Sequence, residues 1–494
     1  MIRKHFGKIR LILIISLVCI LTVALRFSGS IILGDDIANR SELPADMMEP
    51  FAQEFSSHLP IMVMQTTFTA LQVRTHTPTP PPGAVIWIFD NETENRLTNE
   101  PTEVFITATA NYRGNSSINY PYFPKKGFKL HLYHPHLLDP LDYPVFGFAP
   151  ASEWVLRTTH ADKSLLRDWF SYELAATVLE WQPRGRPVHV FLQDIGGEDA
   201  SIYYEGVYFF TENITVGESR LDIGQFSLEE SETIDFEGGG YVVQRDRDRN
   251  NYFSLQEDVY FRYTHPGPGD MTSYEAANIR REIEFYYDFL TKSGAYEGLT
   301  GEDWDYRRYI DIYSFVDYFL LLELLMEVDA GMFSTFVYRP VGGKLVTGPF
   351  WDGDLILGNA WYRNQHYNRF VSLIQSEFIR ELIRDEAFAG LFADRWNQLR
   401  STIWSDEKLF GMFDKMAEYL AEAAVQNERR WPMLFDGETF IWPNPEPYTQ
   451  SWDEEIERTR LMLEKRLSWL DDSIPRLVNE SPNEINLNAG NLNN

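Results

Sequence analysis

Two aspartates flank a predicted β-hairpin. Thr335–Arg339 and Lys344–Thr347 are β-prone runs, and residues 340–343 between them read Pro-Val-Gly-Gly, which is turn chemistry. A hairpin brings its ends together, so Asp329, just before the first strand, and Asp352, just after the second, are expected to converge. Carboxylates held together out of water favour a hard cation, Mg²⁺ or Mn²⁺, with bound phosphate completing its shell. This pattern predicts metal-assisted phosphoryl transfer; the alternative is that both acids cap turns, a common use of Asp.

A further acid and an apolar helix border the predicted hairpin. Asp354 follows Asp352 by two residues, and alternate residues on an extended strand share a face. Gly353 lets the backbone fold tightly between them, so both carboxylates are expected to reach one cation or a pair of cations. Tyr309–Met326 reads as an apolar helix, which would leave the acids at the edge between buried and exposed positions.

Six sequence motifs, spread over about residues 85 to 360, occur in a recognisable order. They are R-G-N-S-S at Arg113–Ser117, P-K-K-G-F-K-L at Pro124–Leu130, D-K-S-L-L-R-D at Asp162–Asp168, E-G-V-Y-F-F-T-E-N-I at Glu205–Ile214, G-G-Y-V-V at Gly239–Val243, and the block Tyr318–Asn359 with W-D-G-D-L-I-L-G-N at its end. On these pieces the chain resembles the CotH family, the spore coat protein H group of atypical protein kinases. The resemblance implies a kinase-like fold and ATP-dependent phosphorylation of protein serine or threonine.

The resemblance implies roles for the acids around the hairpin. Asp329 takes the place of the catalytic base that orients and deprotonates the acceptor hydroxyl, and Asp352 takes that of the ligand to Mg²⁺ or Mn²⁺ at the ATP phosphates. Five residues after Asp329, where kinases and many CotH-like chains have a metal-binding Asn, stands Ser334, a weaker ligand that Asp354 is expected to supplement. Gly353 occupies a position where the family usually has an aromatic residue.

The expected nucleotide contacts come from the amino-terminal part of the domain. Lys126 and Lys129 lie on a predicted strand after the loop that begins at Arg113, whose glycine and successive amides suit anionic oxygens. On a regular strand the two lysines face opposite ways, so one at most enters the cleft, and the alternative is that both are solvated. Glu212, at a predicted strand end, either lines the nucleotide cleft or is a structural acid. Arg167 stands in the matching family motif and is predicted to bind nucleotide.

The amino-acid composition and net charge limit the classes of molecule that the protein is expected to bind. The chain has 494 residues, 44% hydrophobic and 15% aromatic, which excludes a disordered protein, and its formal net charge is −29. Such an acidic chain repels nucleic acid and attracts basic, Ser-rich coat or envelope proteins; the alternative is that the charge serves solubility alone.

The amino terminus predicts export. Basic residues up to Arg10 precede the uncharged run Leu11–Leu25, and no clear cleavage site follows, so residues 1–33 are expected to be a signal anchor, or else a signal peptide. The body would then be membrane-anchored outside the cytoplasm in the cell envelope, or secreted. The single cysteine, Cys19, lies in this run, which leaves the body without disulfides.

The rest of the chain predicts a sheet-rich part followed by a helical part, and with the resemblance this implies an α+β, two-lobed, atypical protein-kinase-like fold preceded by that membrane anchor. Residues 34–83 are expected to be a Pro-rich linker or stalk, and 84–478 a CotH-like kinase domain. Its sheet-rich N-lobe would span about 84–215 and its helical C-lobe about 216–478, with a disordered tail at 479–494. A kinase-derived module that binds basic envelope proteins without turnover and a metal-dependent hydrolase remain as alternatives to the kinase.

Overall fold

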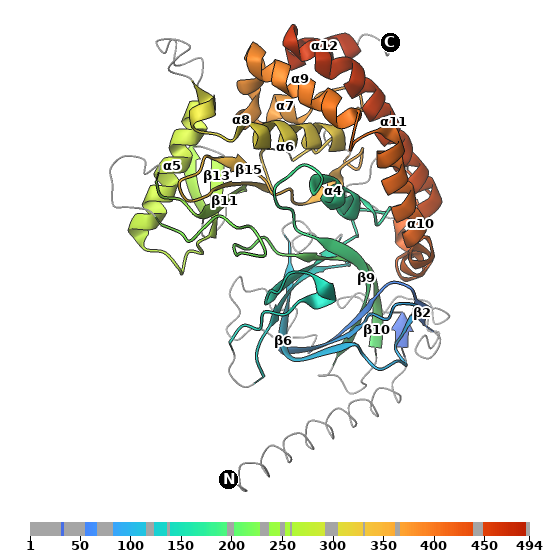
Figure 1. Ribbon diagram of the computed structural model, residues 1–494. Helices are drawn as coiled ribbons and strands as arrows, with labels where there is room; N and C mark the ends of the chain where they lie inside the picture. The colour runs from blue at the N-terminus through green and yellow to red at the C-terminus, as the bar shows by residue number, and fades with distance from the viewer. Residues whose placement is uncertain are drawn as a thin grey trace. The chain divides into compact units, whose positions relative to one another are not determined.

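The chain divides into two compact units. The first comprises Met1–His160, Pro187–Phe210 and Glu422–Pro432, and the second Ala161–Arg186, Thr211–Ala421 and Met433–Asn494. The computed structural model (Figure 1) describes residues 55–66, 83–114, 123–135, 139–194, 202–227, 237–247, 252–256, 259–291, 305–329, 331–360, 366–437 and 448–490, and the backbone of 31–33. Sheets and helices together confirm the predicted α+β class, while the assignment of the units to two kinase lobes stays a prediction.

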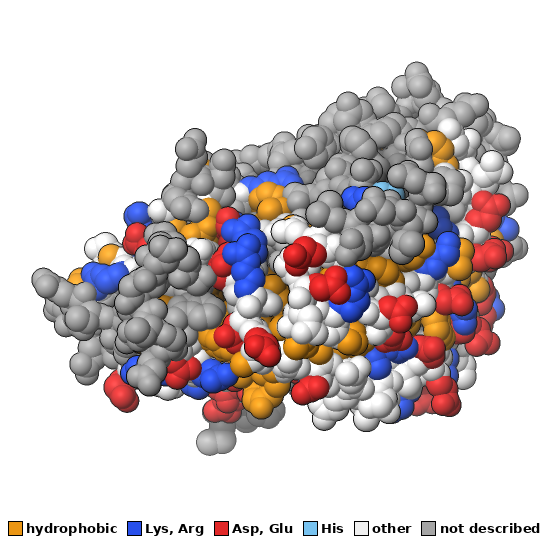
Figure 2. All heavy atoms as spheres, turned by 90° about the horizontal axis from the view of Figure 1, so that it is seen from above, with side chains coloured by type: hydrophobic (Ala, Val, Ile, Leu, Met, Phe, Trp, Pro, Cys, Tyr) orange, Lys and Arg blue, Asp and Glu red, His pale blue; other side chains and the backbone are white. Residues whose placement is uncertain are grey.

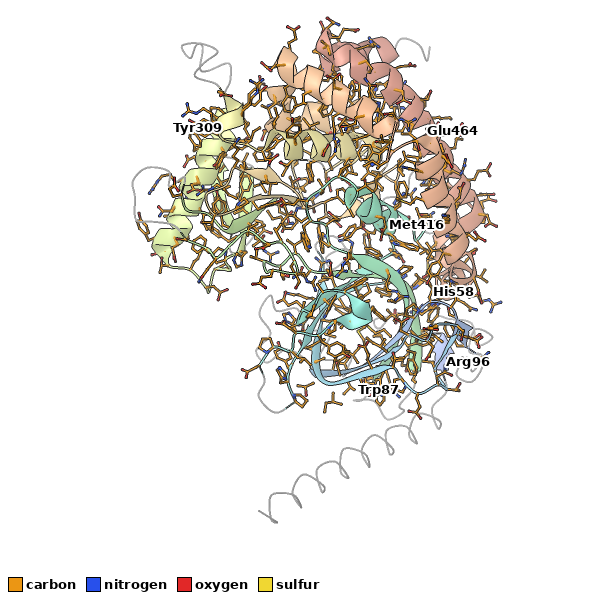
Figure 3. The ribbon with its side chains drawn as sticks, in the orientation of Figure 1. His58, Trp87, Arg96, Tyr309, Met416 and Glu464 are labelled. Carbon is orange, nitrogen blue, oxygen red and sulfur yellow. The ribbon has the colours of Figure 1, made fainter. Side chains whose placement is uncertain are left out.

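The first unit is built on an eight-stranded sheet that closes on itself. Its order is β1-β10-β8-β7-β6-β4-β3-β9, and β9 also pairs with β10. The strands are β1 (Ile31–Leu33), β3 (Ile61–Thr66), β4 (Gly83–Phe89), β6 (Glu103–Arg113), β7 (Gly127–Leu132), β8 (Glu153–Thr158), β9 (Gly185–Asp194) and β10 (Ile202–Glu212). Alternate residues of one strand enter different apolar clusters, as Ile86 and Ile88 join one and Trp87, labelled in Figure 3, joins the other. Both faces of β4 are therefore buried from Ile86 to Phe89.

The predicted linker contains part of this sheet. β3 is buried along its whole length and pairs with β4 antiparallel and with β9 in parallel. The short β2 (Ser56–Ser57) pairs with β5 (Asn95–Arg96). The prediction that residues 34–83 form a stalk is therefore wrong for 55–66, because an apolar run covered on both faces lacks the alternation that marks a half-buried strand.

The second unit contains a five-stranded antiparallel sheet in the order β12-β13-β11-β14-β15. The strands are β11 (Tyr241–Asp246), β12 (Tyr252–Gln256), β13 (Val259–His265), β14 (Thr335–Arg339) and β15 (Val346–Thr347). β14 and β15 pair at Val337 with Thr347 and at Tyr338 with Val346, which confirms the predicted hairpin. The predicted apolar helix is present as α6 (Ile312–Leu325), which begins at the capping residue Asp311.

Helices make up most of the remaining second unit. They are α4 (Arg167–Ala175), α5 (Ser273–Thr291), α7 (Ser372–Gln375), α8 (Glu377–Arg380), α9 (Glu386–Arg400), α10 (Asp406–Arg430), whose last turns belong to the first unit, α11 (Trp452–Ser473) and α12 (Pro482–Gly490). Single turns of 3-10 helix are η3 (Val145–Gly147), η4 (Tyr306–Arg308), η5 (Gly353–Leu355), η6 (Leu382–Arg384), η7 (Pro432–Leu434) and η8 (Ile474–Val478). Arg460 on α11 pairs with Asp414 on α10 at 2.8 Å, near the labelled Glu464 and Met416 (Figure 3).

The predicted disordered tail is wrong for most of its length. Residues 482–490 form α12, which begins with a capping box: Ser481 Oγ accepts from the Glu484 backbone N–H, and the Glu484 carboxylate accepts from the Ser481 backbone N–H. Ile485 is fully buried, and the Asn486 side chain bonds the carbonyl of Phe370. A capped helix with one buried apolar residue is enough to order an Asn-rich segment.

Acidic and basic side chains are mixed on one face of the molecule (Figure 2). On the face shown in Figure 2, acidic side chains stand between basic ones instead of gathering in one patch. Residues 1–30, which hold Cys19 and most of the predicted anchor, lie outside the described part of the chain, as do 34–54. Among the residues that the structure describes, no helix has the length and apolar character needed to cross a membrane.

Candidate functional site

The two ends of the β14–β15 hairpin meet. Ser334 immediately precedes β14, and its hydroxyl donates a hydrogen bond of 3.0 Å to Oδ2 of Asp352, beyond β15. Asp329 begins the turn before the hairpin, where its carbonyl accepts from the backbone N–H of Met332 and Phe333. The predicted convergence of the two flanking segments is thus present, although the roles of their side chains stay predictions.

Both residues of this contact have left-handed backbones. Ser334 has φ 51° and Asp352 has φ 75°, and Met326, which ends α6 nearby in sequence, has φ 56°. Non-glycine residues in this region store about 1–3 kcal/mol each and persist where the surroundings hold them. Such residues gather at active sites, and here they set the directions of Ser334 and Asp352.

Two further buried acids belong to the same cluster. Glu327 is 5% exposed, and its Oε1 accepts from the Asp329 backbone N–H at 2.9 Å. Burial, and then the charges of Asp329, Asp352 and Asp168, raise the pKa of Glu327 well above its usual value. Asp168, on the first turn of α4, is 4% exposed. The cluster therefore contains Asp168, Glu327, Asp329 and Asp352, and these surroundings favour the protonated form of Glu327.

The donors in this cluster suit a hard cation. Carboxylate and hydroxyl oxygens are the ligands that Mg²⁺ and Mn²⁺ prefer. A cation would also offset the repulsion among the charges of Asp329, Asp352 and Asp168, which contribute to the raised pKa of Glu327. Among the described residues, no three acidic, histidine or cysteine side chains are spaced to hold a metal ion by themselves. Mg²⁺ in phosphoryl-transfer sites commonly uses one or two protein ligands, with phosphate and water as the rest. Asp352 and Ser334 fit that pattern.

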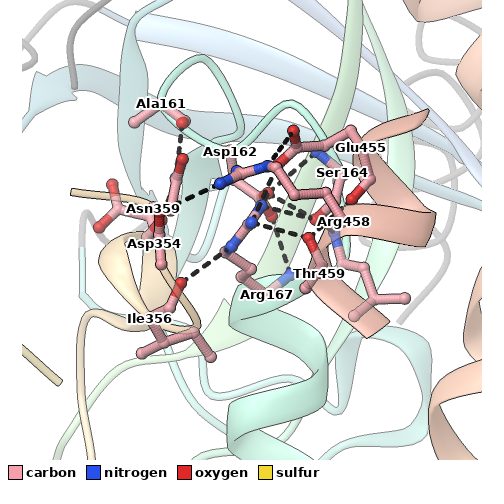
Figure 4. Close-up of polar contacts among 12 residues, drawn as sticks. Ala161, Asp162, Ser164, Arg167, Asp354, Ile356, Asn359, Glu455, Arg458 and Thr459 are labelled. Atoms are coloured by element: carbon pink, nitrogen blue, oxygen red, sulfur yellow. Dashed lines mark hydrogen bonds and ion pairs between the residues drawn. The ribbon is translucent and has the colours of Figure 1, made fainter. Parts of the chain in front are cut away.

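The backbone conformation at Asp354 differs from the extended strand that was expected. Residues 353–355 form the 3-10 turn η5 instead of an extended strand, so the rule that alternate residues share a face does not apply to Asp352 and Asp354. The Asp354 carbonyl accepts from Nδ2 of Asn359, as Figure 4 shows. Its predicted metal contact stays a prediction.

Arg167 is a buried structural centre. Its side chain is 0% exposed and donates hydrogen bonds to five other residues (Figure 4). These acceptors are the carbonyl of Ile356, Oδ1 of Asp162, Oγ of Ser164, Oε1 of Glu455 and Oγ1 of Thr459. The predicted nucleotide contact is untested, but it would need the guanidinium to give up one of these partners.

The segment before Arg167 is a turn instead of the first turn of a helix. Asp162 accepts from the backbone N–H of Ser164 and of Arg167, and Leu165 has φ 62°. α4 therefore starts at Arg167, and it packs against α6 and η5 in the second unit.

Glu212 is also buried in ion pairs. It is 1% exposed, and its carboxylate lies 2.9 Å from Nη2 of Arg184 and 3.3 Å from Nη1 of Arg220. These ion pairs fit a structural role for Glu212, which is one of the two roles expected of it. The other role, a contact with the nucleotide, stays a prediction.

The remaining predicted residues lie in the first unit. Lys129 is on β7 and pairs with Glu153 at 2.8 Å, whereas Lys126 precedes the strand, so the argument about opposite strand faces does not apply to the pair. Arg113 is the last residue of β6, and residues 115–120 after it lie outside the described residues. Among the lysines that the structure describes, Lys125 is the most buried, and it donates to Thr159 Oγ1 at 2.7 Å and Asn427 Oδ1 at 2.9 Å.

Comparisons with known proteins bear on the family. No curated protein matches the chain. The family model described as CotH kinase protein matches residues 110–470, which include the hairpin, the acidic cluster and most of α11. Because this match covers well over half of the sequence, the chain belongs to the CotH kinase protein family.

Proposed function

We propose that this protein is a CotH-like protein kinase that transfers the γ-phosphate of ATP to serine or threonine of basic spore-coat or cell-envelope proteins. The observation that carries the proposal is the Ser334–Asp352 contact of 3.0 Å beside Asp329 and the buried Glu327, in a chain of the CotH kinase family. An acid before the hairpin and an acid after it supply the two functions that phosphoryl transfer needs from protein side chains.

The side chains of the cluster divide the work. Asp329 accepts the proton of the acceptor serine or threonine hydroxyl, and the hydroxyl oxygen forms a bond to the γ-phosphorus of ATP. The bond between the γ-phosphorus and the β–γ bridging oxygen breaks at the same time, which releases ADP. Ser334 orients the Asp352 carboxylate by donating to Oδ2. Asp352 and Ser334 would hold Mg²⁺ or Mn²⁺, which when bound neutralises phosphate charge. Positioning and charge neutralisation would supply most of the rate.

The proposed setting follows from charge and the amino-terminal sequence. The formal net charge of −29 favours encounter with basic partners, with a rate that falls as salt rises. The basic and apolar start of the chain favours membrane attachment with the body outside the cytoplasm, or secretion.

The decisive experiment combines binding and transfer. The full-length protein in detergent is incubated with radiolabelled ATP, Mg²⁺ or Mn²⁺ and a basic Ser-rich polypeptide, and the melting temperature is measured with and without nucleotide. Asp329→Ala is expected to bind nucleotide and lower transfer by about 10²–10⁴-fold. Asp352→Ala is expected to fold and to lose metal-dependent binding.

Two results would contradict these assignments. Transfer at the parental rate by Asp352→Ala would show that this residue does not hold the metal. Nucleotide stabilisation of the parental protein without any transfer would favour the binding module that lacks turnover.

A further inference from the structure

The backbone on the carboxyl side of Asp352 is tied to α4. The N–H of Gly353 donates a hydrogen bond of 2.9 Å to Oδ1 of Asp168. Gly353 follows Asp352 directly, so this bond fixes the peptide group that joins them. Because Asp352 has a left-handed backbone, with φ 75° and ψ 59°, rotation of that peptide would redirect its carboxylate.

The same turn of α4 packs closely against Gly353 and leaves no room there for a side chain. A Cβ added at Gly353 would lie 2.2 Å from Oγ and 3.1 Å from Cβ of Ser171. Ser171 in turn donates to the carbonyl of Asp168 at 3.0 Å. One helical turn thus supplies both an acceptor and a steric wall for the residue after Asp352, and only glycine fits between them.

The support is itself held in place. Arg167, next to Asp168, bonds the carbonyl of Ile356 at 3.0 Å and Oε1 of Glu455 on α11 at 2.8 Å (Figure 4). Asn359 adds a bond of 2.8 Å to the carbonyl of Ala161. The loop from Asp352 to Asn359 is therefore attached to the segment 161–168 at three points.

We propose that Asp168 is a positioning residue, which holds the Asp352 carboxylate in its metal-binding direction by accepting the Gly353 N–H, and that this hydrogen bond, rather than the charge of Asp168, is what the site requires. The inference rests on the proposed function, in which Asp352 holds the cation. Under this proposal Asp168 is not a metal ligand, although it belongs to the same acidic cluster as Asp352. Partners that orient a ligand typically change metal affinity by about 10–100-fold when they are removed.

The test compares Asp168→Asn, which keeps an oxygen for the Gly353 N–H and loses the charge, with Asp168→Ala, which loses both. Binding of Mn²⁺ in the presence of ATP is titrated by electron paramagnetic resonance, and hydrogen exchange is followed on the peptide that contains Gly353. Asp168→Ala is expected to weaken Mn²⁺ binding about tenfold or more and to speed exchange, whereas Asp168→Asn stays within about threefold of the parent. Glu173→Gln, on the exposed side of α4, is the matched control for loss of charge.

The outcomes are distinct. Equal loss of Mn²⁺ binding in both variants would overturn the inference, because the charge would then be what matters, and unchanged binding in both would overturn it as well. If Asp168→Ala does not fold, Asp168→Asn and its exchange rate still decide. Asp352→Ala is titrated in parallel: parental Mn²⁺ binding by that variant overturns the metal assignment and the inference with it, whereas its loss leaves Asp168 as the only question.

Discussion

Glu103, the first residue of β6, is a half-buried acid whose carboxyl is poorly matched to its surroundings. Burial, and then the charge of Asp90, raise the pKa of Glu103 to about 7. Among the described residues its Oε2 is buried without a hydrogen-bond partner. A folded-state pKa above that of the unfolded chain means that the native protein holds the proton more tightly. The stability gained from Glu103 is therefore full below about pH 4.5, the ordinary value, and is lost as the pH rises through 7.

Glu103→Gln removes this titration. The variant is expected to melt above the parental protein at pH 8 and close to it at pH 5, because the neutral form is already favoured at the lower pH. Thermal unfolding at the two pH values measures the difference, with Glu92→Gln at an exposed position nearby as the control. An equal change in melting temperature at both pH values would contradict the assignment.

The acids at the hairpin show how far single residues can be predicted. Asp329 and Asp352 follow from their positions around two β-prone runs, and Ser334 follows from the family resemblance. Glu327 and Asp168 were missed, because nothing in the sequence says that a carboxyl is buried or which charges surround it. The spacing of Glu327, two residues before Asp329, was the only available signal.

At the scale of elements, α6 and α11 are joined by a buried ion pair. Arg466 and Glu323 are both 0% exposed, and Nη2 of Arg466 lies 2.6 Å from Oε2 of Glu323. Glu323 also accepts from the backbone N–H of Val371 and Leu373. Removing one member of such a pair leaves a buried charge, whereas replacing both is far less harmful.

Arg466→Met is therefore expected to destabilise the second unit by about 3–5 kcal/mol. Combining it with Glu323→Gln should recover part of this loss, because no buried charge then remains. Urea unfolding monitored by tryptophan fluorescence checks both variants. A double variant no more stable than Arg466→Met would mean that the ion pair is not what joins these helices.

Elements were predictable where local signals agree with tertiary contacts. The hairpin has turn residues between β-prone runs, and α6 lies in a long apolar run, so both were found. β3 was missed because an apolar run next to Pro- and Thr-rich sequence shows no period, and its pairing with β9 joins segments far apart in the chain. α12 was missed although Ser481 and Glu484 have the spacing of a capping box.

At the scale of the molecule, the folded body begins well before residue 84. A chain that starts at Gly83 lacks β2 and β3. Because β3 pairs with both β4 and β9, its loss interrupts the sheet between these two strands and exposes both apolar clusters. Such a chain is expected to aggregate, whereas one that starts at Phe51 loses only the three-residue β1 from this sheet and should remain soluble and melt close to the parent. Size-exclusion chromatography and circular dichroism compare the two. Equal melting temperatures would show that β3 is dispensable.

The first unit is assembled from pieces that leave the ribosome far apart in time. Its sheet uses residues 61–66 and 185–194, and its last piece is residues 422–432, where Asn427 Oδ1 accepts from the Val207 backbone N–H and Arg430 donates to the Tyr204 carbonyl. A nascent chain therefore cannot finish its amino-terminal unit until most of the protein has been synthesised. The strands of the first unit that are synthesised first keep apolar surface exposed until residues 422–432 have been made. We therefore expect the growing chain to depend on a holding chaperone during synthesis.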